Sequence, residues 1–487
     1  MNTSFINKKW ILGAGDAFVS LNPTTGQKLL ELKAVNAEQV DSAVAAARAA
    51  QDSWSALTYT ARYEYIISFI NILQEQKDSL IKTIAEETGK TLWESATEVQ
   101  AMFAKADISL QAYKDRTFDQ RTKLDQGDLV VRHKPIGVLA VFAPFNFPAH
   151  LPNGHIIPAL IAGNTIVLKP SEFTPLVAIK LVELWEQANL PAGVINLLQG
   201  ADSVGKHLAA HQDINGLLFT GSSKVGKILH NQFGGSPEKM LALEMGGNNP
   251  LIVDGVSNIN AAVYDIINSA YITSGQRCTC ARRLYLKNDA NGDQILSKLV
   301  EATKKIEVGH YDRQPQPFIG SLISKEAAVD LVRAQDLLLS AGGEVLVKLQ
   351  HLDVNSGLVS PGIIDMSNAT KTFDQEWFGP LLQVYRFDSL SAAIDKANAT
   401  QYGLSSALLS DSRDSYEQYL AKIKSGLANW NRQTTGSLSQ APFGGIGVSG
   451  NFRPSAYYAA DYCAYPVASI ERDCVALPDN LVCGLTL

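Results

Sequence analysis

The sequence has little excess of charge of either sign. Its 487 residues include 42 Lys and Arg against 48 Asp and Glu, which gives a formal net charge of −6. Proteins that bind nucleic acid or anionic lipid usually present concentrated positive charge. The composition therefore argues against a nucleic-acid partner and favours work on a small molecule.

Cysteine is scarce, and long hydrophobic runs are absent. The five cysteines are an odd number and form no C-x-x-C pair, which predicts reduced thiols and no metal site. The most apolar region, residues 156–168, contains a proline and a glycine and is too short to span a bilayer. The first twenty residues lack the pattern of a secretory signal. We therefore expect a cytoplasmic protein with no membrane partner.

Short apolar runs alternate with helix-like stretches along most of the chain. The runs at 137–143, 165–168, 194–197 and 216–219 are followed by a second alternation, from about 249 to 409. Such alternation is typical of parallel strands joined by helical crossovers. We predict an α/β fold with two open α/β domains in series.

The segment 117–133 has a different pattern, because single polar and apolar residues alternate in it. We expect an exposed β-hairpin that covers the sheet edge of another subunit. With the tail at 460–487, it predicts a homodimer or homotetramer.

Two glycine-rich segments resemble nucleotide motifs, but one lacks the required structural context and the other lacks a required residue. Gly445, Gly447 and Gly450 fit G-x-G-x-x-G, but no strand precedes them and Pro454 follows, so a loop closing a site is the better interpretation. The segment 221–227 resembles a P-loop, but Ile228 replaces the required Ser or Thr. A strand, Gly-Ser and helix in this order would nevertheless present free N–H groups to a pyrophosphate. An ordinary capped helix is the alternative.

Four positions could do chemistry, each with a structural alternative. Cys278 follows Arg277 and a helix-like stretch, and the cation and the helix dipole would favour the nucleophilic thiolate. Glu244 stands between apolar residues that would raise its pKa toward that of a useful base. Asn146 could donate to an oxyanion or cap a turn. Lys169, at the end of a strand, would help to bind a ribose.

Taken together, these motifs resemble the aldehyde dehydrogenase superfamily over nearly the whole chain. The set is FNFP at 145–148, KPSE at 169–172, FTGS at 219–222, EMGGNNP at 244–250, GQRC at 275–278, E-x-F-G-P at 376–380 and PFGG at 442–445. The resemblance implies a dinucleotide-binding domain at 1–116 and 135–245 and a catalytic domain at 246–445. It also implies an oligomerisation element at 117–134 and 460–487.

The resemblance also implies a role for each matched residue. Cys278 would be the nucleophile, Glu244 the general base, and Asn146 an oxyanion donor together with the Cys278 N–H. NAD would be the cofactor, with Glu172 disfavouring the 2′-phosphate of NADP. The positions expected to bind it are Lys169, Glu172, Gly221, Ser222, Ser223, Lys224, Val225, Gly226, Glu376 and Phe378. Phe145 replaces a tryptophan common in the family, which should alter packing more than chemistry.

The segments 150–155, 429–436 and 451–458 resemble one branch of this family, the N-succinylglutamate 5-semialdehyde dehydrogenases of arginine catabolism. A substrate with several carboxylates needs cations or donor groups. We expect these from Arg432 or Arg453, with Thr434, Thr435 and Ser437. Another carboxylated aldehyde, such as succinic or glutamic semialdehyde, is the alternative substrate. A catalytically inactive NAD-binding protein is disfavoured because both Cys278 and Glu244 are present.

Overall fold

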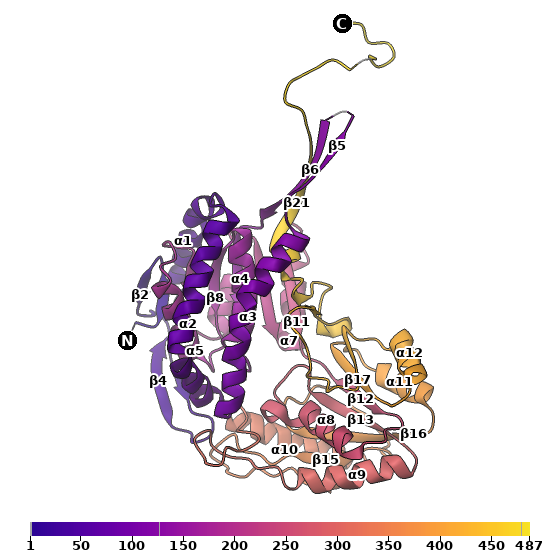
Figure 1. Cartoon of the computed structure of the whole chain (residues 1–487). Coiled ribbons are helices and arrows are strands. Elements are labelled where there is room, and N and C mark those ends of the chain that lie inside the picture. The colour runs from indigo at the N-terminus through magenta and orange to yellow at the C-terminus, as the bar shows by residue number, and fades with distance from the viewer. Residues whose placement is uncertain (1, 126, 479) are drawn as a thin grey trace.

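The computed structural model describes residues 2–125, 127–478 and 480–487. Two seven-stranded sheets, each with helices packed against it, form the body of the molecule. A long hairpin projects from the body, and the C-terminal tail extends beyond it (Figure 1).

The first sheet has a parallel core of five strands and an antiparallel edge. Its order is β11 (Met240–Met245), β10 (Gly216–Gly221), β7 (Val138–Phe142), β8 (Thr165–Lys169), β9 (Ile195–Leu197), β1 (Ser4–Ile6) and β2 (Lys9–Ile11). The chain runs outward from β7 through β8 and β9, then returns to add β10 and β11 on the other side of β7. Such a reversal opens a crevice at the carboxyl ends of the strands, where α/β proteins bind ligands.

Both faces of this sheet are buried, which explains why its strands are short continuous apolar runs. Leu139 and Val141 belong to one core, while Val138 and Ala140 of the same strand belong to another. Helices α2 (Tyr59–Thr88), α3 (Leu92–Arg116), α4 (His150–Ala162) and α5 (Pro175–Gln187) supply the first core. The second core comes mainly from α1 (Ala37–Ser55), α6 (Asp202–Ala210) and α7 (Ser223–Phe233).

The second sheet follows the same plan. Its order is β14 (Glu344–Val347), β15 (Gly362–Asp365), β16 (Leu381–Phe387), β13 (Ala281–Lys287), β12 (Asn249–Val253), β17 (Ser405–Leu409) and β18 (Leu427–Trp430). All neighbours are parallel except β14, which is antiparallel to β15. Its helices are α8 (Ile259–Tyr271), α9 (Ala290–Thr303), α10 (Lys325–Ser340), α11 (Leu390–Asn398) and α12 (Arg413–Lys422).

The projecting hairpin consists of β5 (Gln120–Leu124) and β6 (Gly127–Pro135), and β21 (Ala464–Glu471) pairs with β6 along its whole length (Figure 1). Arg132 bonds to Glu471 across this pair. The remaining elements are β3 (Ala17–Leu21) with β4 (Lys28–Lys33), β19 (Pro442–Phe443) with β20 (Ser455–Ala456), α13 (Ala459–Tyr462), and the 3₁₀ turns Ile272–Gly275 and Gly447–Ser449.

The predicted α/β fold is confirmed, and the alternating runs at 137–219 correspond to β7 through β10. The hairpin expected at 117–133 is present two to three residues further along the chain. Strands β1 to β4 and helix α3 were not anticipated from the sequence. Among the described residues, no helix has the length and apolar character that crossing a membrane requires.

Candidate active site

A cavity of about 800 Å³ lies where the carboxyl ends of β7, β8, β10 and β11 meet loops of the second sheet. This is the size of a typical ligand pocket. It brings together most residues that the sequence singled out: Cys278, Glu244, Asn146, Lys169, Glu172, Gly221, Ser222, Val225, Glu376, Phe378, Thr435 and Ser437.

Three of the predicted substrate residues lie outside the cavity wall. Arg432 and Arg453 are exposed. The charge of Arg432 acts on Asp265 of α8, and the Arg453 guanidinium contacts only the neighbouring Phe452 carbonyl, at 3.4 Å, among the described residues. Thr434 is fully buried, and its backbone bonds to the Ser269 and Ser405 hydroxyls. The expectation that these three contact the substrate is therefore not supported.

The loop that carries Cys278 has an unusual backbone. Thr273 and Ser274 adopt left-handed conformations, with φ of 56° and 52°, and Gly275 follows at 69°. A β-branched residue rarely has positive φ, and each such residue costs on the order of 1–3 kcal/mol. Gly275 has no room for a side chain, since a Cβ would lie 2.3 Å from the Gly379 carbonyl carbon. The surrounding contacts must therefore hold this shape.

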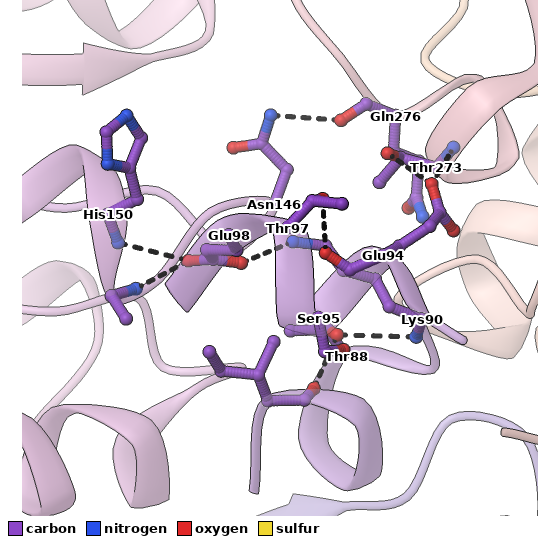
Figure 2. A network of polar contacts seen from close by, with 12 residues as sticks. Thr88, Lys90, Glu94, Ser95, Thr97, Glu98, Asn146, His150, Thr273 and Gln276 are labelled. Atoms are coloured by element: carbon purple, nitrogen blue, oxygen red, sulfur yellow. Dashed lines mark hydrogen bonds and ion pairs between the residues drawn. The ribbon is translucent and has the colours of Figure 1, made fainter. Parts of the chain in front are cut away.

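Glu94, in the first turn of α3, supplies the main contact. Its Oε1 accepts from the backbone N of Thr273 at 2.6 Å and from the Thr273 hydroxyl at 2.8 Å (Figure 2). The Ser274 hydroxyl donates to the Gly320 carbonyl, and Arg282 donates to the carbonyls of Gly275 and Arg277. The loop is thus anchored by α3, which packs on the first sheet, and by β13 of the second sheet.

Cys278 lines the cavity, whereas Cys280 is fully buried with its thiol against the Ile272 carbonyl. Burial raises the pKa of Cys278 well above its usual range, and the carboxylates of Glu376 and Glu244 raise it further. The expectation that Arg277 favours the Cys278 thiolate is wrong, since the charged groups that act on this thiol are Glu376, Glu244 and Cys280. The Arg277 guanidinium turns toward Thr273 and Glu94, and its charge acts on Cys280, where it partly opposes the rise in pKa that burial causes. Helix α8, which precedes Cys278, ends at Tyr271, so the negative end of its dipole is the end nearer to Cys278 in the chain. A negative helix end does not favour a thiolate.

Asn146 follows β7 and is nearly buried. Its Nδ2 donates to the Gln276 carbonyl at 2.9 Å, two residues before the cysteine (Figure 2). The amide group carries a second N–H, which this bond leaves available. Asn146 is therefore fixed to the cysteine loop rather than capping a local turn, as an oxyanion donor requires.

Glu244 lies at the end of β11 with 4% of its surface exposed. Its Oε1 accepts from the Ser455 backbone N at 3.2 Å, while Oε2 has no partner among the described residues. Burial raises the pKa of Glu244 well above its usual range, and the bonds from Ser455 oppose this only in part. A carboxylate with one free oxygen and a raised pKa fits a general base.

The other end of the cavity is built around the first turn of α7. The Ser222 hydroxyl caps the helix by accepting from the Val225 N–H at 3.3 Å. Ser223 and Lys224 present the first N–H groups of the helix, which have no partner within a helix. Their side chains, and Gly226, which packs against Met245, lie outside the wall. The exposed apolar side chains of Val225 and Ile228 line this end as well.

Lys169 and Glu172 form the neighbouring wall at the end of β8. The Lys169 Nζ lies 3.5 Å from Glu172 Oε2, and the lysine side chain is the more deeply buried of the two. Burial lowers the pKa of Lys169, and the nearby Glu172 carboxylate opposes that shift. The pair offers a donor and an acceptor to the hydroxyls of a ribose, so these residues fit a dinucleotide.

Glu376 and Phe378 lie on the wall between this end and the cysteine. Glu376 Oε1 accepts from the Gly247 N–H at 3.1 Å, and burial raises its pKa to about 7. A Cβ on Gly246 would lie 1.8 Å from Glu376 Oε2, so only glycine allows this approach. Phe145 packs edge-on against Phe378 at 5.9 Å, a packing role as expected for this substitution.

Four basic side chains of the wall were not anticipated as site residues: Lys105, His150, His155 and Lys206. Val99, Met102, Ala106 and Ala112 mark the buried side of α3, and Lys105 is buried among them. The sequence signal that could have identified Lys105 is its position among the regularly spaced apolar residues of this helix. In the part of the chain that the structure describes, no group of three His, Cys, Asp or Glu is placed to hold a metal ion.

Comparison with known proteins identifies the architecture. The sequence model described as the aldehyde dehydrogenase family matches residues 10–466. The chain belongs to this family. A structure described as an NADP-dependent enzyme of E. coli is 30% identical, with a TM-score of 0.90 over 96% of this chain and 97% of that one. The aldehyde dehydrogenase KauB of Pseudomonas aeruginosa is also 30% identical, with a TM-score of 0.91 over 96% of each chain.

A betaine aldehyde dehydrogenase mutant of Staphylococcus aureus is 26% identical, with a TM-score of 0.91 over 98% of this chain and 97% of that one. Its structure is described as a complex with NAD+ in which a cysteine carries a BME modification. These similarities support a dehydrogenase of the same fold and do not distinguish among aldehydes.

Proposed function

We propose that this protein is an NAD-dependent dehydrogenase that oxidises N-succinyl-L-glutamate 5-semialdehyde to N-succinyl-L-glutamate, a step of arginine catabolism. The observation that carries the chemistry is that Cys278, Glu244 and Asn146 meet on the wall of one cavity. The three sequence segments that resemble the succinylglutamate branch support this substrate, as does a buried lysine, Lys105, on the cavity wall.

In the mechanism, the Cys278 sulfur attacks the aldehyde carbon to form a thiohemiacetal, and Asn146 with the Cys278 N–H holds the developing oxyanion. NAD+, held by the residues described below, would supply a positive charge that favours the thiolate and an acceptor for the hydride of the thiohemiacetal carbon. Loss of that hydride would leave a thioester on Cys278. Glu244 takes a proton from water as the water attacks the thioester. The products are the carboxylic acid and the free Cys278 thiol.

The residues at the far end of the cavity fit this cofactor. The first turn of α7, with Gly221 and Ser222, would hold the pyrophosphate. Lys169 and Glu172 would bind the adenosine ribose, and Glu376 with Phe378 the nicotinamide riboside. One similar enzyme is described as NADP-dependent. We propose NAD here because the Glu172 carboxylate would repel a 2′-phosphate.

The domains follow from this assignment. Residues 1–116 and 135–245 would bind NAD, and residues 246–445 would carry the nucleophile. The hairpin with β21 and the tail, 117–134 and 460–487, would join subunits into a homodimer or homotetramer.

The test is NADH production from N-succinylglutamate semialdehyde, compared with succinic and glutamic semialdehydes. We expect kcat/KM to be at least a hundredfold higher for the succinylated compound. A preference for succinic or glutamic semialdehyde would transfer the proposal to that substrate, and a flat profile would contradict it.

The nucleophile is tested separately. Cys278→Ala should abolish the burst of NADH, and Cys280→Ala should retain it because that thiol is buried away from the cavity. A burst of NADH from Cys278→Ala would contradict the mechanism, because it would show that Cys278 is not the nucleophile.

A further inference from the structure

The positive charges of the cavity wall are unevenly paired. Lys169 lies 3.5 Å from Glu172, Lys206 lies 3.8 Å from Asp202, and Arg277 lies 4.0 Å from Glu94. Lys105 is the remaining lysine of the wall, and no carboxylate of the described residues lies within 4 Å of its ammonium group. An unpaired charge at this position requires an explanation.

Lys105 is more deeply enclosed than the paired cations. It is 2% exposed, in α3, and its stem passes Gly154 of α4. Its Nζ donates to the Ala456 carbonyl at 3.2 Å. An ammonium group has three N–H donors, and burying one with a single neutral acceptor is unfavourable. The side chain therefore lacks the anionic partner that buried lysines usually have.

Glu98, the carboxylate of the wall that lies on the same helix as Lys105, cannot serve as that partner. Glu98 Oε2 bonds to Lys90 at 2.6 Å, and Oε1 accepts from the backbone N–H groups of Ala149 and His150 (Figure 2). The charge of Glu98 is thus matched within the protein and leaves Lys105 uncompensated.

A second polar group beside Lys105 also lacks a partner. The Nδ1 atom of His150 is buried and has no hydrogen bond among the described residues. Burial is the main cause that lowers the pKa of His150 to about 4, with smaller contributions from the Lys105 and Lys90 charges and an opposing one from Glu98, so the imidazole is neutral. A neutral imidazole can donate one N–H to a ligand.

We propose that Lys105, with the imidazole of His150, binds a carboxylate of the substrate remote from its aldehyde. The Ala456 carbonyl that receives Lys105 directly follows Ser455, whose N–H bonds to Glu244, so the subsite and the base share one segment. This assignment rests on the proposed function, because it requires a carboxylated aldehyde. It gives Lys105 the role that the sequence suggested for Arg432 or Arg453.

The pH dependence of binding follows from the burial of Lys105. Burial lowers its pKa to about 8. The titratable groups that interact with Lys105 are His150 and His155 of α4 and Cys463, and none of these has a pKa between 7 and 9. Glu98 and Lys90 also act on His150, and they form an ion pair with each other. The unliganded lysine therefore loses its proton as the pH rises through about 8. KM for a carboxylated aldehyde should increase there.

The test is Lys105→Met, with Lys114→Met as the control because Lys114 is exposed on the same helix. We expect Lys105→Met to lower kcat/KM for N-succinylglutamate and succinic semialdehydes at least roughly thirtyfold, mainly through KM. Propanal, which has no carboxylate, should change less than about threefold. Lys105→Arg should recover part of the loss and remove the rise in KM above pH 8.

Two results would overturn the assignment. Equal losses for charged and neutral aldehydes would make Lys105 a structural residue, and an unchanged KM for charged aldehydes would place the subsite elsewhere. If the wild-type enzyme has no preference for carboxylated aldehydes, the proposed substrate class fails. Glutarate inhibition of propanal oxidation then tests Lys105 separately. A Ki that rises in Lys105→Met supports the anion site, and an unchanged Ki contradicts it.

Discussion

Glu94 and Glu244 are both buried acids near the nucleophile loop, and burial raises the pKa of both. They differ in how their oxygens are used. Glu94 Oε1 accepts two bonds from Thr273, and its Oε2 accepts from the Thr91 hydroxyl at 3.4 Å. Glu244 has a bond to Oε1 from Ser455 and an unpartnered Oε2 beside the cavity.

The difference separates a supporting acid from a reactive one. A carboxylate whose oxygens are all engaged stabilises the groups bonded to it. A carboxylate with one free oxygen in a cavity can bind and deprotonate water, and the same incomplete pairing makes its burial costly. Removing Glu94 should therefore affect stability more than catalysis, and removing the Glu244 carboxylate should affect catalysis more than stability.

Glu244→Gln tests the reactive side and should have the largest effect on turnover. Loss of the base should lower kcat roughly 10²- to 10⁴-fold. The first NADH burst should persist, because hydride transfer precedes water attack. Rapid-mixing absorbance at 340 nm measures both phases. Loss of the burst together with turnover would mean that Glu244 acts before the thioester forms.

Glu94→Ala tests the supporting side. It leaves the buried Thr273 N–H unsatisfied and Arg277 without its nearest carboxylate, which should destabilise the protein by about 2–4 kcal/mol. We expect kcat to fall by roughly tenfold as the cysteine loop relaxes, less than for Glu244→Gln. Thermal unfolding and steady-state rates measure the two effects.

Glu94→Gln is the conservative control because it keeps an acceptor oxygen for Thr273. It should recover part of both the stability and the rate. A Glu94→Ala enzyme as stable as the wild type would show that the left-handed turn does not depend on this contact.

The comparison also shows what the sequence could predict. Cys278, Glu244 and Asn146 lie at or just after strand ends or in glycine-rich loops, and short apolar runs mark those strands. The apolar runs therefore predicted the fold class, whereas the site residues were identified only because the combined motifs resemble the aldehyde dehydrogenase family. The alternation of apolar and polar residues that marks a strand or a helix can be recognised within a short stretch of sequence, without knowledge of distant contacts.

The support of the site depends on contacts that are distant in sequence. Glu94 bonds to Thr273 across 179 positions, and threonine is a poor choice for a left-handed turn, so no local pattern indicates this bond. Arg277 adjoins Cys278 in the chain, but its side chain points to Glu94 and Phe147. Adjacency in sequence therefore suggested the wrong partner. Lys105 was missed because α3 itself was not anticipated.

The pH dependence of turnover sharpens the role of Glu244. Its raised pKa means that the base is protonated over a wider range than an ordinary glutamate, so turnover should fall about tenfold per unit below that pKa. Stability should change in the opposite direction. Because the folded pKa exceeds the unfolded one, the wild type loses stability as the pH rises from the unfolded toward the folded value.

Glu244→Gln should lack both trends, since an amide does not titrate. Rates normalised to the NADH burst, and unfolding temperatures from pH 5 to 9, measure them. A Glu244→Gln enzyme whose stability falls with pH as steeply as that of the wild type would assign the trend to another acid, of which Glu376, with a pKa of about 7, is the first to examine.

The smallest effect is expected at the other end of the cavity, where Glu172 is partly exposed and pairs with Lys169. Glu172→Gln removes the charge that would repel a 2′-phosphate, so the ratio of kcat/KM for NAD to that for NADP should fall severalfold, with less change in kcat. Glu183→Gln, on the following helix with similar exposure, is the matched control and should leave the ratio unchanged. Water screens a partly exposed charge, which is why this carboxylate should influence cofactor choice far less than buried Glu244 influences turnover. If Glu172→Gln changes the ratio more than a hundredfold, the carboxylate contacts the cofactor in an environment from which water is excluded.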